Sequence, residues 1–235
     1  MIYHTPAGAA PRLYRDMLKQ PHVLIAGTTG SGKSTAINGI IYTALYSAPG
    51  DVSFALIDTK CTELSPWRRL PHTVRYISRA EDAPALLADV LGWTRKRAQT
   101  AAAQGLKTYD GGDVFVVIDE LGDLIFSSRE TVSLLGQLAM LGRAARVHLI
   151  AGTQCPNRKT LSAEFAANMP ARLGLRCQDR IESRQIVGTP DCIRLPMYGV
   201  GLYRCPAYRD PVPVTVPMIP DEELKARARW WERQR

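Results

Sequence analysis

The chain has 235 residues, 46% hydrophobic and 22% charged, so it can bury one substantial core and has the composition of a globular protein. Its 30 Lys and Arg residues against 22 Asp and Glu residues give a formal net charge of +8, which favours a polyanionic partner. Neither a run of 18 apolar residues nor a secretory leader pattern occurs, so we expect no membrane span, no signal peptide and a cytoplasmic location.

Taken in chain order, the hydrophobic pattern predicts alternating strands and helices. We expect strands at 22–26, 52–58, 73–77, 114–118, 147–151 and 171–176, and helices at 33–47, 81–104, 129–143, 161–167 and 221–233. Prolines and short β-prone runs between residues 190 and 220 indicate edge strands or a wrapping segment. The alternation predicts an α/β fold with a mainly parallel sheet, helices on both faces and ligands at the carboxyl ends of the strands.

A glycine-rich segment follows the first expected strand. Residues 27–34, G-T-T-G-S-G-K-S, match the phosphate-binding loop pattern G-x-x-x-x-G-K-[ST]. In such a loop backbone N–H groups and a helix N-terminus face the phosphates, Lys33 reaches the β- and γ-phosphates of ATP, and the Ser34 hydroxyl binds Mg²⁺. The expected nucleotide-binding residues are Gly27, Thr28, Thr29, Gly30, Ser31, Gly32, Lys33, Ser34 and Thr35.

A second motif lies at the end of the apolar run 114–118, where two carboxylates follow the expected strand. Asp119 is suited to hold Mg²⁺, and Glu120 is suited to orient the water that attacks the γ-phosphate. Two acids that merely cap a strand are the alternative, which the phosphate-binding loop upstream disfavours. Together the two motifs predict ATP hydrolysis.

Further segments in the same order resemble the motor domain of the FtsK/SpoIIIE family. Besides the two motifs, the matching segments are 57–60 (I-D-T-K), 121–124 (L-G-D-L), 142–144 (G-R-A), 148–154 (H-L-I-A-G-T-Q), 168–172 (N-M-P-A-R), 181–184 (I-E-S-R) and 199–201 (G-V-G). The resemblance covers about residues 12–205. It implies a RecA-like P-loop ATPase, usually a hexameric ring that pumps double-stranded DNA through its centre.

The resemblance also implies two roles outside the loop. Gln154 matches the family's sensor of the γ-phosphate, with a polar loop residue as the alternative. Arg143 matches the family's arginine finger, which is supplied to the site of a neighbouring subunit and neutralises charge on the phosphoryl oxygens. Arg146 is the other candidate for the finger, and either arginine could instead interact with a helix dipole.

DNA contacts are implied in two loops that line the pore. Arg158 and Lys159 fall in the first loop, although Cys155 replaces the family's usual arginine there, and Arg180 and Arg184 fall in the second. Cationic side chains suit phosphate contacts that position duplex DNA without reading its sequence. A solvated loop is the alternative for the first pair, and contact with a neighbour's nucleotide is the alternative for Arg184. The group Asp58, Lys60 and Glu63 is expected either to structure the nucleotide interface or to form a structural turn.

We divide the chain into a lead-in (1–20), a motor domain (21–220) and a C-terminal helix (221–235). Trp230 and Trp231 of this helix are expected to dock on the domain, with a surface for a partner as the alternative. Family translocases that act in cell division carry a membrane region, an upstream domain and a winged helix, none of which this sequence shows. We therefore expect plasmid or conjugative-element DNA transfer, with double-stranded DNA, further copies of the chain and a membrane-bound protein as partners. A viral or phage packaging ATPase, a HerA-type DNA-processing motor and a nucleotide-dependent switch or scaffold are the alternatives.

Overall fold

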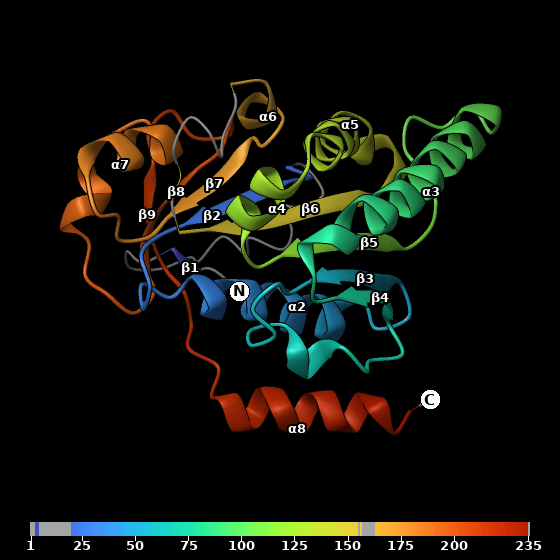
Figure 1. Ribbon diagram of the computed structural model, residues 1–235, viewed down its shortest axis with the longest axis horizontal. Coiled ribbons are helices and arrows are strands. Elements are labelled where there is room, and N and C mark those ends of the chain that lie inside the picture. Colours follow the sequence, from blue (N-terminus) through green and yellow to red (C-terminus); the bar gives the residue numbers. More distant parts are fainter. Residues whose placement is uncertain (1–2, 5–19, 155, 157–162, 235) are drawn as a thin grey trace.

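A nine-stranded sheet runs through the part of the chain that the structure describes (Figure 1). The structure is a computed structural model, and it describes residues 3–4, 20–154, 156 and 163–234. The strand order is β1-β9-β8-β7-β2-β6-β5-β3-β4. The strands are β1 (Tyr3–His4), β2 (Val23–Ala26), β3 (Val52–Ile57), β4 (Thr73–Ile77), β5 (Asp113–Ile118), β6 (Val147–Thr153), β7 (Ala171–Gly174), β8 (Val200–Arg204) and β9 (Val212–Thr215).

The six strands from β7 to β4 are parallel, as the alternation of strands and helices predicts. Central strands of such a sheet are covered on both faces, and β2, β5 and β6 are accordingly buried at every position. β8 and β9 extend the β7 edge in antiparallel pairing. Two strands are therefore present between residues 190 and 220, as expected, but neither lies at the edge of the sheet, because β1 pairs with β9 and forms that edge.

Helices cover both faces of the sheet (Figure 1). On β5, Val114, Val116 and Ile118 belong to one hydrophobic core, while Phe115 and Val117 belong to the other, because successive side chains point to opposite faces. The first core is covered by α3 (Ala83–Ala103), α4 (Leu121–Ser127), α5 (Arg129–Ala145), α6 (Ala163–Ala167) and α7 (Arg180–Val187). The second is covered by α2 (Lys33–Ser47), the 3-10 helix η1 (Ser65–Trp67) and α8 (Asp221–Glu232). Two further 3-10 helices are η2 (Ala80–Asp82) and η3 (Asp191–Arg194).

Two short helices are not predicted by the hydrophobic pattern. α7 has eight residues, which are too few to establish a helical period, although the residues that cap its two ends are types that favour helix ends. Asp179 Oδ1 accepts the N–H groups of Ile181 and Glu182 at 2.7 and 2.8 Å, and Gly188 ends the helix at φ 84°. α4 follows β5 directly, with the Glu120 side chain accepting the N–H of Gly122 at 3.4 Å.

The C-terminal helix α8 docks on the domain, as expected. Leu224 and Ala228 are buried in the core that also contains α2. The Trp231 ring meets His72 edge to face, with ring centroids 4.7 Å apart, whereas Trp230 is exposed and the expectation for that residue is wrong. Within the described residues, the helices include none with the length and apolar content needed to cross a bilayer.

Candidate active site

Three segments meet at the carboxyl edge of the sheet. β6 lies between β2 and β5, and all three strands run parallel, with Ala26 opposite Thr153 and Ile118 opposite Ala151. The residues that follow these strands must therefore gather at one edge. They are the glycine-rich loop 27–32, the pair Asp119 and Glu120, and Gln154.

The backbone of the loop requires glycine at two positions. Gly30 has φ 76° and Gly32 has φ 104°, values that residues with a side chain rarely adopt. A Cβ atom at Gly32 would also lie 2.7 Å from the nitrogen of Gly199. The loop leads directly into α2 at Lys33, and the first N–H groups of an α-helix have no intrahelical acceptor. The start of α2 can therefore donate hydrogen bonds to a phosphate.

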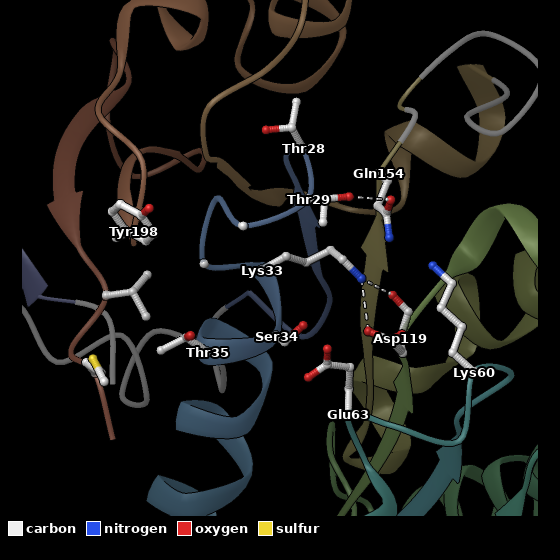
Figure 2. Close-up of a pocket in the computed structure, with 14 residues that line it drawn as sticks. Thr28, Thr29, Lys33, Ser34, Thr35, Lys60, Glu63, Asp119, Gln154 and Tyr198 are labelled. Carbon is white, nitrogen blue, oxygen red and sulfur yellow. Dashed lines mark hydrogen bonds and ion pairs between the residues drawn. The ribbon is translucent and has the colours of Figure 1, made fainter. Parts of the chain in front are cut away.

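Lys33 is 6% exposed and points at the second motif (Figure 2). Its Nζ donates to the carbonyl oxygen of Asp119 at 2.7 Å and to Oδ1 of the same residue at 2.9 Å. The fold therefore places Lys33, the expected phosphate-binding cation, in direct contact with Asp119, the expected Mg²⁺ ligand.

Glu120 is 7% exposed, and three groups hold its carboxylate. The N–H of Gly122 donates to it at 3.4 Å, the N–H of Gln154 donates at 3.2 Å, and Lys60 Nζ lies 3.5 Å away. Gln154 in turn accepts the Thr29 hydroxyl through Oε1 at 3.1 Å. A continuous chain of contacts thus joins the glycine-rich loop, Gln154 and Glu120. Figure 2 shows the part of this chain between Thr29 and Gln154.

A cavity of about 370 Å³ opens between these elements, which is within the range of nucleotide-sized ligand sites. The Ser34 hydroxyl and the Asp119 carboxylate offer the oxygen ligands that Mg²⁺ prefers, so the residues present fit this metal. The cavity is lined by Thr28, Thr29, Gly30, Gly32, Lys33, Ser34, Thr35, Lys60, Glu63, Asp119, Gln154, Tyr198, Val216 and Met218. Gly27 and Ser31 belong to the loop and are not among the lining residues.

Comparison with known sequences decides the family. The sequence pattern of the FtsK/SpoIIIE family matches residues 7–114. DNA translocase FtsK of Clostridium acetobutylicum is 31% identical over 227 residues, which covers 89% of this chain and 30% of that protein. The chain belongs to the FtsK/SpoIIIE family. It spans about 30% of the length of the curated relative it matches.

Two solved structures share the fold of this FtsK/SpoIIIE chain. The pCW3 conjugation coupling protein TcpA, in its monomer form with ATPγS, has a TM-score of 0.82 and 22% identity, over 97% of this chain and 70% of that chain. ATPases 2 and 3 of Thermomonospora curvata EccC, in complex with a signal sequence peptide, have a TM-score of 0.80 and 21% identity, over 99% of this chain and 46% of that chain. The fold is therefore that of a RecA-like P-loop ATPase domain, as expected.

Arg143, which matches the arginine finger of the FtsK/SpoIIIE family, lies far from this cavity. Arg143 is exposed in the last turn of α5, at the edge of the sheet where β6 begins. Gln154 follows the other end of β6, and seven strand residues at roughly 3.3 Å each separate the two edges by about 20 Å. Arg143 does not line the nucleotide cavity, whereas it does line a second cavity together with His22 and Met140.

Arg146, the other candidate for the finger, is engaged within its own subunit. Its guanidinium makes two hydrogen bonds to the Asp113 carboxylate, at 2.8 and 2.9 Å, and His148 Nε2 contacts the same carboxylate at 2.9 Å. Burial acts to raise the pKa of Asp113, but the hydrogen bonds from His148 and Arg146 outweigh it and hold that pKa below its usual value. The geometry therefore favours Arg143 over Arg146 as a group that can reach another subunit.

Only part of the expected DNA-contacting set can be located. Arg158 and Lys159 lie outside the described residues. Arg180 and Arg184 are exposed on α7, in the segment that follows β7. The N–H of Thr28 donates to the carbonyl oxygen of Arg176 at 2.9 Å, so the segment leading into α7 is hydrogen-bonded to the glycine-rich loop.

Five lining residues are not among the expected nucleotide contacts. Lys60 and Glu63 follow β3, and the sequence associates them with the nucleotide interface without assigning a contact. Tyr198 precedes β8, and Val216 and Met218 follow β9, so all three flank the antiparallel extension of the sheet. Their positions depend on how that extension packs against the loop, which no local pattern encodes.

Proposed function

We propose that this domain hydrolyses ATP in a Mg²⁺-dependent reaction. It uses the energy to move along double-stranded DNA as a hexameric ring, in which six copies surround one duplex. The observation that carries the proposal is that Lys33, Asp119 and Gln154 line one nucleotide-sized cavity. The carboxylate of Glu120 accepts a hydrogen bond from the N–H of Gln154. A site that only bound nucleotide would need neither a water-orienting carboxylate nor a sensor of the γ-phosphate.

Each side chain has a distinct task in this reaction. Lys33 binds the β- and γ-phosphates. Ser34 and Asp119 would hold Mg²⁺, which would supply positive charge to the phosphate oxygens. Glu120 orients the attacking water and accepts its proton. Gln154 contacts the γ-phosphate, and because it is bonded to Glu120 and Thr29, release of that phosphate alters all three positions.

The placement of Arg143 supports assembly with further copies of the chain. The part of the chain that the structure describes contributes lysines but not an arginine to the lining of the nucleotide cavity. Arg143 stands at the opposite edge of the sheet, where it can reach only the cavity of another copy. A finger supplied in this way stabilises the transferring phosphoryl group and makes hydrolysis depend on assembly.

DNA is the proposed substrate of the movement because both candidate DNA segments begin beside the nucleotide. The segment with Arg158 and Lys159 follows Gln154 directly, and the segment with Arg180 and Arg184 follows the carbonyl group to which Thr28 is bonded. The net charge of +8 suits a polyanion. FtsK of Clostridium acetobutylicum is named a DNA translocase, which agrees with this substrate.

Transfer of a plasmid or conjugative element in the cytoplasm, with a membrane-bound partner, is the setting we propose. Its support is the fold shared with TcpA, named a conjugation coupling protein. DNA packaging and HerA-type processing would use the same chemistry with a different partner. A polypeptide substrate is the competing case, because the similar EccC structure holds a signal sequence peptide.

Displacement of a third strand from triplex DNA tests the proposal. The protein should remove a triplex-forming oligonucleotide from duplex DNA when ATP and Mg²⁺ are present, and should fail with AMP-PNP. Glu120→Gln is the matched inactive control, since its nucleotide cavity remains. ATP hydrolysis that responds to peptides and not to duplex DNA would overturn the choice of substrate.

A further inference from the structure

Two large apolar side chains stand exposed at the mouth of the nucleotide cavity. Tyr198 is 86% exposed and Met218 is 82% exposed, the two highest values among the large hydrophobic side chains that the structure describes. Both line the cavity, and Val216, which is 4% exposed, lines it as well. Exposed apolar surface concentrated at a pocket indicates a surface that a ligand covers.

The backbone around Tyr198 is bonded to the glycine-rich loop. The N–H of Gly199 donates to the carbonyl oxygen of Ser31 at 2.8 Å, and the N–H of Val216 donates to the carbonyl oxygen of Gly199 at 2.8 Å. Gly32 leaves no room for a Cβ atom beside Gly199. The backbone beside Tyr198 and at Val216 is therefore held at a fixed place relative to the loop that binds phosphate, so this part of the cavity is already formed.

Tyr198 itself has an uncommon backbone conformation. Its φ of 66° lies in the left-handed region, where residues other than glycine and asparagine are rare. Strain of this kind persists where the surrounding structure imposes it, often at ligand sites. Here the bonds of Gly199 and Val216 impose it, and they present the Tyr198 ring to the cavity.

The cavity is polar at one end and apolar at the other. In Figure 2, Tyr198 lies on one side of Lys33, while Lys60 and Asp119 lie on the other. A nucleoside triphosphate has the same polarity, with a charged phosphate chain at one end and a flat aromatic base at the other. Once the phosphates lie against Lys33, the base must occupy a different part of the cavity.

We propose that Tyr198 and Met218 bind the nucleobase, with the Tyr198 ring stacked on the base and Val216 beneath it. The proposal rests on ATP being the ligand of this cavity, as proposed above. Aromatic side chains stack on the faces of bases, and the polarizable sulfur of Met218 makes favourable contacts with aromatic rings. The binding of a nucleotide covers both exposed side chains.

Two ligands that share the phosphates and differ in the base test this assignment. AMP-PNP carries adenine, whereas inorganic tripolyphosphate carries only the phosphate chain. Calorimetric titration with Mg²⁺ should show that Tyr198→Ala weakens AMP-PNP binding about tenfold, as expected for loss of one stacking contact, and changes tripolyphosphate binding less than twofold. Met218→Ala should weaken AMP-PNP about threefold.

Matched variants exclude other causes. Tyr198→Phe keeps the ring and should bind AMP-PNP as the wild type does. Tyr46→Ala removes another exposed tyrosine, which is not a lining residue, and should bind both ligands normally. Lys33→Ala should weaken both ligands, because it removes the phosphate contact.

The outcomes separate the two proposals. Equal weakening of AMP-PNP and tripolyphosphate by Tyr198→Ala would mean that the residue supports the glycine-rich loop, which overturns the base site. Normal AMP-PNP binding by Tyr198→Ala, with a change in oligomeric state, would make Tyr198 a subunit contact and also overturn it. A wild-type protein that binds neither ligand would refute ATP as the ligand itself.

Discussion

Lys33 and Asp119 form a buried ion pair across the nucleotide cavity, with Nζ 2.9 Å from Oδ1 and 2.7 Å from the main-chain carbonyl oxygen. Their side chains are 7% and 1% exposed. ATP with Mg²⁺ would give each partner a new counter-charge, the phosphates for Lys33 and the metal for Asp119. The pair thus keeps both charges compensated until the ligand arrives.

The first prediction concerns the stability of this pair. Lys33→Met should lower the free energy of unfolding by about 3 kcal/mol without nucleotide, because it leaves a buried carboxylate without its partner. The double variant Lys33→Met, Asp119→Asn should recover part of the loss, since the uncompensated charge is gone. Urea unfolding of the single and double variants measures both effects. A single variant as stable as the wild type would show that the pair contributes nothing to folding, and wild-type ATP turnover by it would contradict the phosphate-binding role.

The second prediction separates ATP binding from hydrolysis. Glu120→Gln should bind ATP with near wild-type affinity and hydrolyse it at least about 100-fold more slowly, because the amide cannot take a proton from water. The amide oxygen can still accept the N–H of Gln154, so the local structure should persist. Asp123→Asn is the control, because this exposed acid of α4 accepts the Thr59 hydroxyl, does not line the nucleotide cavity and should leave turnover within twofold when replaced. Normal turnover in Glu120→Gln would place the base elsewhere.

The parallel sheet and the phosphate end of the site could be predicted from local patterns. β5 is a continuous apolar run ending in two acids, and the glycine-rich segment fits only a loop with left-handed glycines at positions such as 30 and 32. Both features depend on residues close together in the sequence. α2 and β4 accordingly have the expected boundaries, Lys33–Ser47 and Thr73–Ile77.

The apolar end of the site could not be predicted in this way. Tyr198 reaches the cavity because Gly199 bonds to Ser31, a contact between residues that lie far apart in the sequence. The same holds for Asp113, where His148 and Arg146 meet the carboxylate from another strand and from the end of α5. Such contacts are consequences of packing and not of any local pattern.

The third prediction tests whether Arg143 acts across subunits. Arg143→Ala and Lys33→Ala should each be inactive alone, but mixing them should restore some ATPase activity, because a mixed ring can contain an intact cavity facing an intact arginine. Arg146→Ala does not serve as a second finger variant, since its loss breaks the contact with Asp113 and should lower stability. Mixing must be verified by native mass spectrometry. Mixed rings without restored activity would mean that Arg143 acts within its own subunit or only in folding.

The fourth prediction is that the buried ring of His22 makes the free energy of unfolding decrease in acid. Nδ1 of this buried ring accepts the N–H of Leu149 at 2.9 Å, a role that requires an unprotonated nitrogen. Burial, together with the nearby His148, lowers the pKa of His22 to about 3, against 6.5 for the free side chain. Above pH 6.5 the ring is neutral in both the folded and the unfolded state and adds no pH dependence.

Below pH 6.5 the unfolded chain binds a proton that the folded chain cannot bind at His22 until about pH 3. Between pH 6.5 and about pH 3, the contribution of His22 to the free energy of unfolding should therefore fall by about 1.4 kcal/mol for each unit of decrease in pH. His22→Asn, whose amide oxygen can accept the same N–H, should not show this dependence of the free energy of unfolding on pH. Urea unfolding of both proteins between pH 7 and pH 4 gives the difference in slope. Identical slopes would show that His22 is protonated in the folded protein.

The fifth prediction concerns DNA. Duplex DNA should stimulate ATP hydrolysis with little sequence preference, and its affinity should fall steeply as salt rises, because phosphate contacts release counterions. Replacing Arg158, Lys159 and Arg180 together with alanine should reduce the slope of log K against log salt by about 3 and abolish the stimulation by DNA. Basal nucleotide binding should not change, since none of the three belongs to the glycine-rich loop or to the acids that follow β5.

Replacing Arg95, Lys96 and Lys107, exposed cations in and after α3, is the charge-matched control and should leave the slope unaltered. Equal reductions in the two triple variants would reveal a general charge effect and remove the assignment of DNA contacts to the segments after Gln154 and β7.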